Sequence, residues 1–226
     1  MSKDNKVLIF APHPDDETLG VGGTINKMSQ LGYDVYVVIV SGHLPPLYDQ
    51  QVFNKTKEEA KKALDILGVK KAFFLELPAT RLADIPVSEM NAGLFKFILD
   101  IKPEIVFTPY PDRHIDHRII FESVMVITRP VGPGRNINIL AAYETLSETH
   151  WNAPHIEPNF IPNWTIDISE NMSYKIDAMN CYESQISKTN GPRSIEAIEA
   201  LAKFRGTQSG FIYGESFHII RMNNWF

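Results

Sequence analysis

Short apolar runs alternate with longer amphipathic segments through the first half of the chain, and few folds accommodate that order. Buried strands are expected at 6–10, 33–42, 71–77 and 104–110, with helices at 18–32, 54–69 and 87–103. Strands that alternate with helices form a mostly parallel sheet, because right-handed crossovers place the helices on its faces. The sequence therefore predicts an α/β fold, a Rossmann-like three-layer sandwich around a mostly parallel central sheet.

The pattern is less regular after residue 130. We expect a loop at 131–136, a strand at 137–147, a proline-rich surface excursion at 148–164, a helix at 169–185 with Ser169 as its N-cap, a helix at 194–206 ended by Gly206, and a strand at 216–222. No repeat, low-complexity segment or linker stands out. One domain spanning 1–226 is the expectation.

Composition excludes several classes of protein. A net charge of −5 provides no basic field for a phosphate backbone, so nucleic acid is not expected as a partner. No apolar run reaches the roughly 18 residues of a membrane helix, and the run after the N-terminus is too short for a signal peptide. The single cysteine, Cys181, provides neither a disulfide framework nor a thiolate cluster. These features predict a cytoplasmic protein without a membrane span.

Two polar clusters lie at the carboxyl ends of two of the expected strands. The segment PHPDDE (12–17) comes directly after the first strand, and PYPDRHIDHR (109–118) begins in the last residues of the fourth strand and continues beyond its end. Ligands of doubly wound sheets bind beyond the carboxyl ends of the strands. The two clusters are therefore expected to meet at one rim of the sheet.

Each cluster has an alternative interpretation when taken alone. The acids of the first could complement a helix dipole, and the histidines of the second could be exposed polar residues. Together they offer histidine, aspartate and histidine donors, which suit Zn²⁺ or a similar ion with one position open for water. The remaining carboxylate and histidine would then be an acid–base pair.

These residues resemble a known family. PHPDDE followed by GGT (22–24), and later HIDH (114–117), is similar to the PIG-L/LmbE-like de-N-acetylases, which are metal-dependent hydrolases that remove acetyl from N-acetylglucosamine-type sugars. A Tyr-x-Ser-Gln stretch at 182–185 and the segment FRGTQSGFIYGESFH (204–218) extend the resemblance along the chain. The resemblance implies an LmbE-like form of the fold.

The resemblance also implies a role for each residue of the two clusters. His13, Asp16 and His117 would ligate the metal, and Asp15 would be the general base that takes a proton from the attacking water. His114 would polarise the amide carbonyl, with Asp116 supporting it and keeping it cationic. Glu17 is expected to make helix-dipole contacts or to support the site residues. The metal is expected to be Zn²⁺, with Fe²⁺ or another divalent ion left open.

Arg81 and Asp84 follow the third strand, and the resemblance implies that they hold the sugar. The alternative is an exposed loop ion pair. His43 follows the second strand, where several relatives have a Thr-Arg-Gly-type segment, so this chain departs from the pattern. His43 could meet the substrate or have no role.

Further residues have weaker assignments. Tyr143 and Glu144 are expected to edge the pocket. Trp151 could stack on a sugar or on a second chain, whereas core packing is expected for Trp164. The roles of His150, His155 and His218 are open, and all three are read as structural or surface residues.

The expected activity is a zinc-dependent deacetylation of a small N-acetylated sugar or sugar conjugate. One alternative is a metal-dependent phosphoesterase that uses the same rim. Another is a non-catalytic module that binds a nucleotide through GVGG (20–23), but these glycines lie inside the expected helix, where they would allow close packing against the sheet. The acceptor sugar and a homo-oligomeric state stay open.

Overall fold

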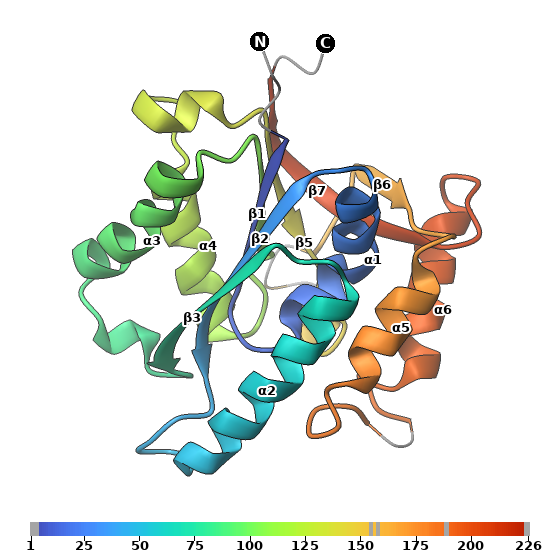
Figure 1. Cartoon of the computed structure of the whole chain (residues 1–226), viewed down its shortest axis with the longest axis horizontal. Coiled ribbons are helices and arrows are strands. Elements are labelled where there is room, and N and C mark those ends of the chain that lie inside the picture. Colours follow the sequence, from blue (N-terminus) through green and yellow to red (C-terminus); the bar gives the residue numbers. More distant parts are fainter. Residues whose placement is uncertain (1–4, 154–155, 157–158, 188–189, 224–226) are drawn as a thin grey trace.

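The computed structural model describes residues 5–153, 156, 159–187 and 190–223, and its centre is a seven-stranded sheet (Figure 1). The strand order is β3-β2-β1-β4-β5-β7-β6. Strands β1 to β5 pair in parallel, and β7 pairs antiparallel with β5 and β6. The strand bounds are β1 (Lys6–Ala11), β2 (Asp34–Gly42), β3 (Lys71–Pro78), β4 (Ile105–Pro109), β5 (Ile139–Tyr143), β6 (Trp164–Asp167) and β7 (Gly214–Met222). The expected mostly parallel α/β sheet is confirmed.

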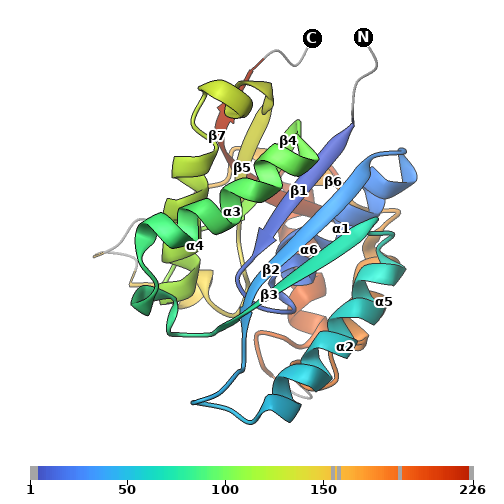
Figure 2. The ribbon, with the colours of Figure 1, turned by 60° about the vertical axis from the view of Figure 1, so that its left-hand side comes forward.

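Helices cover both faces of this sheet (Figures 1 and 2). On one face lie α1 (Asp16–Gln30), α2 (Gln50–Ile66), α5 (Met172–Asn180) and α6 (Ile195–Thr207), and on the other α3 (Val87–Ile101) and α4 (Ile115–Ile127). Three short 3₁₀ segments lie at Leu82–Asp84, Gly132–Asn136 and Thr149–Trp151. Along β1, Val7 and Ile9 pack into one apolar layer and Leu8 and Phe10 into the other. The uninterrupted apolar run of β1 is thus explained by burial on both faces.

Several expected elements differ from the structure. Helix α4 and strand β6 were not predicted, and the strand expected at 137–147 is confined to β5. Ser169 is not the N-cap of α5, because its hydroxyl donates to Asp167 Oδ1 at 2.6 Å and the helix starts only at Met172. Gly206 does not end α6 but lies in its last turn, where a Cβ would be 2.8 Å from the backbone of Tyr213.

All seven strands belong to one sheet, which supports the expectation of one domain; that expectation stays a prediction. None of the described helices has the length and apolar character needed to cross a membrane.

The order of the strands creates a crevice at the end of β1. The chain leaves β1 into α1 on one face and leaves β4, the neighbouring strand, into α4 on the other (Figure 2). Open α/β sheets bind ligands at such a switch in strand order, beyond the carboxyl ends of the strands. Both polar clusters lie at this position.

Helix α1 approaches the sheet closely because glycines face it. A Cβ on Gly20 would lie 2.2 Å from Tyr143 Cδ2 and 2.9 Å from the carbonyl oxygen of Glu144, and a Cβ on Gly23 would lie 2.7 Å from Ile168. The expectation that these glycines allow close packing is confirmed.

The substitution Gly20→Ala is therefore expected to lower the free energy of unfolding by about 1–3 kcal/mol, since the added methyl group overpacks the contact. Gly93→Ala in α3 is the matched control, because nothing lies within 4 Å of its Cβ position. Alanine should stabilise that partly exposed helical position by about 0.5–1 kcal/mol. Denaturant unfolding of the two variants measures the difference, and equal effects would contradict the close packing of α1.

Candidate active site

The two polar clusters meet at the crevice between β1 and β4. Nε2 of His13 lies 3.0 Å from Oδ2 of Asp116, although 103 positions separate them in the sequence. The ring centroids of His13 and His114 are 4.5 Å apart, and those of His114 and His117 are 5.1 Å apart. The predicted convergence of the two segments is confirmed.

Asp16 lies between two of these histidines. Its Oδ2 is 3.1 Å from Nδ1 of His13 and 3.3 Å from Nε2 of His117. In a tetrahedral zinc site with bonds of about 2.0–2.1 Å, neighbouring ligand atoms are about 3.3 Å apart. His117 Nε2 is buried and has no hydrogen-bond partner among the described residues, as a nitrogen reserved for an ion would.

Ring nitrogens of His13, His114 and His117 also lie within 4.8 Å of one another, and this trio is the group of side chains in the described part of the chain that could hold a metal ion. Two ligand sets therefore fit this rim, one with Asp16 and one with His114 beside the other two histidines.

Two buried carboxylates each contact the ring nitrogen of a histidine that does not face Asp16. Asp112 Oδ2 lies 3.0 Å from Nδ1 of His117, and Asp116 performs the same task for His13. A carboxylate on the second ring nitrogen fixes the tautomer of a metal-binding histidine and raises its basicity. Asp112 was not predicted; the available signal was an acid five positions before His117 in the same polar segment.

The centre carries an excess of buried negative charge. Burial lowers the pKa of His13, but contacts with Asp116 and Asp16 outweigh it and raise the pKa to about 9. For His117, burial likewise opposes Asp16 and Asp112, which raise its pKa to about 10. Such a group of carboxylates favours a divalent cation, so the residues fit a metal site.

Asp15 has different surroundings from Asp16. Its backbone φ is 114°, in the left-handed region that favours glycine, and it immediately precedes α1, which begins at Asp16. Its buried Oδ2 has no hydrogen-bond partner among the described residues and lies 3.2 Å from Nε of Arg193. Burial raises the pKa of Asp15 to about 7, with Arg193 opposing the shift and Asp16 and Glu17 adding to it.

Glu17 supports the start of α1 from within. Its carboxylate accepts hydrogen bonds from the backbone N–H of Asp15 at 3.2 Å and from the hydroxyls of Thr18 and Tyr182. The expected contact with a site residue is thus present.

His114 differs from the expectation in one respect. The carboxylate of Asp116 contacts His13 and the backbone N–H of Thr80, and only the backbone N–H of Asp116 donates to His114 Nδ1, at 3.2 Å. Burial, with His13 and His117 nearby, lowers the pKa of His114 to about 4. The prediction that the Asp116 carboxylate supports His114 and keeps it cationic is not supported, because that carboxylate contacts His13 and Thr80. The lowered pKa favours a neutral His114 ring, which would carry its proton on Nε2 because Nδ1 accepts the backbone hydrogen bond.

A cavity of about 180 Å³ opens over the centre. Among its lining residues are His13, Asp15, His43, His114, Glu148 and Arg193. His43 packs against Tyr48 with ring centroids 4.4 Å apart, so the departure from the Thr-Arg-Gly pattern builds an aromatic wall.

Two other residues expected at the substrate do not line the cavity. Arg81 and Asp84 form an exposed ion pair with each other at 2.8 Å. Their sugar-binding role stays a prediction, and the structure shows the ion pair that was its alternative.

Tyr143 does not edge the pocket. Its side chain is fully buried, packs on Gly20, and donates its hydroxyl to the carbonyl oxygen of Phe10 at 2.9 Å. The substrate-binding assignment of Tyr143 is therefore wrong.

The remaining candidates make contacts within the fold. Trp164 packs in the core with Phe107 and Phe217, as expected. Trp151 is exposed, and its ring lies 5.7 Å from the Arg113 guanidinium. His218 Nδ1 lies 2.8 Å from the carbonyl oxygen of Ile161. His155 lies outside the described residues.

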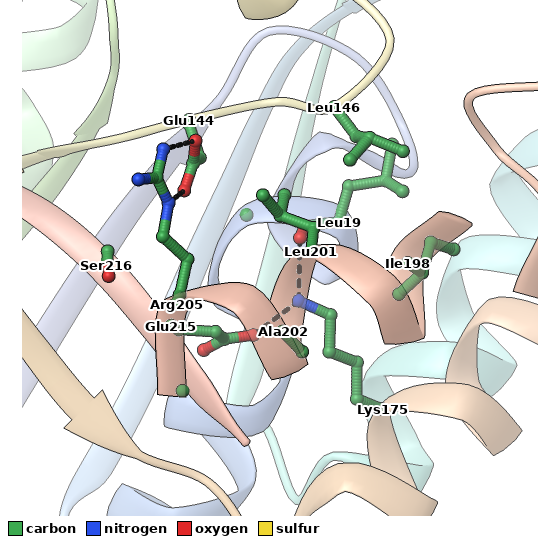
Figure 3. Close-up of a pocket in the computed structure, with 12 residues that line it drawn as sticks. Leu19, Glu144, Leu146, Lys175, Ile198, Leu201, Ala202, Arg205, Glu215 and Ser216 are labelled. Atoms are coloured by element: carbon green, nitrogen blue, oxygen red, sulfur yellow. Dashed lines mark hydrogen bonds and ion pairs between the residues drawn. The ribbon is translucent and has the colours of Figure 1, made fainter. Parts of the chain in front are cut away.

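A second, nearly filled pocket of about 20 Å³ is lined by residues of α1, α5, α6 and β7 (Figure 3). Paired charges close it: Arg205 donates two 2.7 Å hydrogen bonds to Glu144, and Lys175 donates to Glu215 at 2.6 Å. Such a volume holds about one water, so it is not a substrate site. Glu144, expected at the pocket edge, belongs here, and its Oε2 also contacts His150 Nε2 at 2.9 Å.

The Lys175–Glu215 pair braces the middle of α1. Lys175 donates to the carbonyl oxygen of Leu19 at 2.7 Å (Figure 3), and Glu215 accepts from the backbone N–H groups of Gly23 and Thr24 at 2.9 and 2.7 Å. The brace fixes the helix whose first residues are Asp16 and Glu17.

Comparisons with known proteins give a consistent result. The family model described as PIG-L, GlcNAc-PI de-N-acetylase, matches residues 8–128. A diacetylchitobiose deacetylase from Thermococcus kodakarensis is 30% identical over 95% of this chain and 83% of its own length. A probable N-acetyl-alpha-D-glucosaminyl L-malate deacetylase 2 from Bacillus anthracis is 25% identical over 83% of this chain and 84% of its own.

A solved structure has a similar fold. The N,N'-diacetylchitobiose deacetylase from Pyrococcus horikoshii, in complex with its inhibitor MPG, superposes with a TM-score of 0.77 at 27% identity. The match covers 96% of this chain and 84% of that one.

Proposed function

Because the chain belongs to the PIG-L family of GlcNAc-PI de-N-acetylases, we propose that it is a metal-dependent hydrolase that removes the N-acetyl group from an N-acetylglucosamine-type sugar or sugar conjugate. The products are acetate and a free amine. One observation carries the proposal: Asp15, which has a carboxylate oxygen that accepts no hydrogen bond from the described residues, lines a cavity beside histidine and aspartate atoms spaced as metal ligands.

His13, Asp16 and His117 hold the ion in this proposal. Their mutual distances support that set, and the backbone contact at Nδ1 of His114 supports leaving His114 out of it. A divalent cation supplies a Lewis acid that lowers the pKa of water and polarises the amide carbonyl. Zn²⁺ is the first candidate and Fe²⁺ the second, because nitrogen and oxygen donors discriminate weakly between them.

Asp15 is the proton carrier of the proposed reaction. Its carboxylate takes a proton from the attacking water as the C–O bond forms, and returns it to the departing nitrogen as the C–N bond breaks. A pKa of about 7 suits both directions near neutral pH.

His114 stabilises the charge that develops on the amide oxygen. Its Nδ1 accepts a backbone hydrogen bond, so the neutral ring presents an Nε2–H donor. A preorganised donor of this kind contributes about 3 kcal/mol to the transition state. A cationic ring is not needed for this role.

The substrate class follows from the relatives and the cavity. One relative is named for diacetylchitobiose and another for N-acetyl-alpha-D-glucosaminyl L-malate, so the shared element is an N-acetylated glucosamine. The rings of His43 and Tyr48, tilted by 60° to each other, line the cavity and offer aromatic contacts to a sugar ring. The proposal places the reaction in the cytoplasm, a setting that suits a chain with a single cysteine.

Acetate release over a panel of N-acetylglucosamine, N,N'-diacetylchitobiose and N-acetylglucosaminyl malate tests the proposal, with and without a chelator. We expect release from at least one sugar, lost on chelation and restored by Zn²⁺ or Fe²⁺. Phosphate release from p-nitrophenyl phosphate, measured in parallel, represents the phosphoesterase alternative. Phosphate release without acetate release, or acetate release that resists the chelator, would refute the proposal.

A further inference from the structure

Asp15 and Asp16 are neighbours in the sequence, yet they have different roles in the proposed reaction. Asp16 must bind the ion, whereas Asp15 must keep its carboxylate free to carry a proton. A divalent cation attracts any carboxylate within reach, so some feature of the fold has to hold Asp15 in place. Its positive φ sets the backbone conformation but does not by itself select the side-chain rotamer.

Arg193 is the charged group that contacts the free oxygen of Asp15. It lies between α5 and α6, its side chain is 28% exposed, and its Nε is 3.2 Å from Asp15 Oδ2. Both atoms are buried and have no hydrogen-bond partner among the described residues. The contact is thus an ion pair that leaves the carboxylate oxygen able to accept a hydrogen bond from a water molecule.

The backbone at Arg193 and at the next residue is hydrogen-bonded. Its carbonyl oxygen accepts from the N–H of Ser187 at 3.1 Å, and the next residue, Ser194, caps α6 by accepting from the N–H of Ala197 at 3.2 Å. Arg193 also forms part of the cavity wall with His43 and Gln185. These hydrogen bonds hold the backbone segment from which the guanidinium reaches Asp15.

We propose that Arg193 is a positioning residue that holds the Asp15 carboxylate toward the cavity and away from the metal ligands. The inference rests on the proposed function. A guanidinium suits the task better than an ammonium group, because its planar, delocalised charge and fixed N–H geometry restrain a carboxylate in one orientation. Without Arg193, Asp15 turns toward the ion and joins its ligands.

The test uses the full-length protein loaded with Co²⁺, whose visible absorption reports the number of ligands. In Arg193→Ala, a carboxylate added to the ion is expected to weaken this absorption, and Asp15→Asn in the same chain is expected to restore it. Loaded with its active metal, Arg193→Ala should lose about 10- to 100-fold in kcat, with KM nearly unchanged. Arg135→Ala is the matched control, because this exposed arginine precedes β5, at the opposite end of that strand from the centre.

Two results would overturn the inference. An unchanged Co²⁺ spectrum in Arg193→Ala would show that Asp15 needs no restraint. A raised KM with an unchanged kcat would assign Arg193 to an anionic group of the substrate. Arg193→Lys repeats both measurements if the alanine variant does not fold, and should retain most of the wild-type spectrum. The spectrum needs no turnover, so it reports on Arg193 even if every sugar in the panel proves inert.

Discussion

Asp15→Asn is expected to reduce acetate release by about 10²- to 10⁴-fold while the protein keeps its metal. Asparagine has nearly the shape of aspartate but cannot accept a proton from water. The ligand candidates keep their own contacts, since Asp16 reaches His13 and His117 without involving Asp15. The measurements are acetate release and metal content on the same preparations.

Thermal unfolding distinguishes a loss of catalytic activity from a failure of the variant to fold. Burial raises the pKa of Asp15 to about 7, above its ordinary value. For an acid, a raised folded-state pKa means that ionisation costs stability, and the cost grows as the pH rises through the folded pKa. At pH 8, Asp15→Asn should therefore melt no lower than the wild type. Asp65→Asn on the exposed surface of α2 is the control, and should change neither activity nor melting temperature.

An active Asp15→Asn enzyme would refute the base assignment and leave the metal site standing. An inactive variant that also lost its metal would instead place Asp15 among the ligands. The two outcomes are distinguishable because activity and metal content are measured independently.

The position of the site could be predicted because parallel strands end at a common rim. That rule requires only the order of strands and helices, and it brought His13 and His117 together before any distance was known. The residue types at the rim then limited the chemistry to a metal centre with an acid–base group. The convergence at 3.0 Å between His13 and Asp116 follows from topology rather than from local sequence.

Contacts that depend on side-chain direction could not be predicted in this way. Tyr143 ends β5 at the correct rim, but its ring fills the space left by Gly20 and leaves the cavity to other residues. The support of His13 by Asp116 was likewise missed, because the family resemblance assigned Asp116 to His114 in the same motif. Its real partner comes from the other cluster.

Arg193 illustrates a further limit. It lies in an irregular segment between α5 and α6, with no periodicity and no motif to mark it, and its partner is far away in the sequence. Helix α4 was missed for a related reason: after its first turn, the run RIIFESVMVI is rich in β-branched and aromatic residues, which favour strands. Packing against the sheet overrides that local preference.

His117→Ala is expected to lose the metal. The dissociation constant of the metal should rise by more than roughly 100-fold, the upper range for removing a residue that contacts a ligand but not the metal itself. The substitution removes a buried nitrogen 3.3 Å from Asp16 Oδ2 and leaves Asp112 without its ring partner. Metal content after dialysis and competition with a chromophoric chelator measure the change. His218→Gln, in which the replaced ring contacts only a backbone carbonyl oxygen in the described structure, should retain full occupancy.

His114→Ala distinguishes the two ligand sets that fit the rim. If His13, Asp16 and His117 hold the ion, this variant keeps its metal and loses activity, because only the donor to the amide oxygen is gone. If the three histidines hold it, His114→Ala loses metal as His117→Ala does, whereas Asp16→Asn keeps it. The 3.1 and 3.3 Å distances from Asp16 to the two other rings lead us to expect the first result. Full occupancy in His117→Ala would refute both sets, since His117 belongs to each.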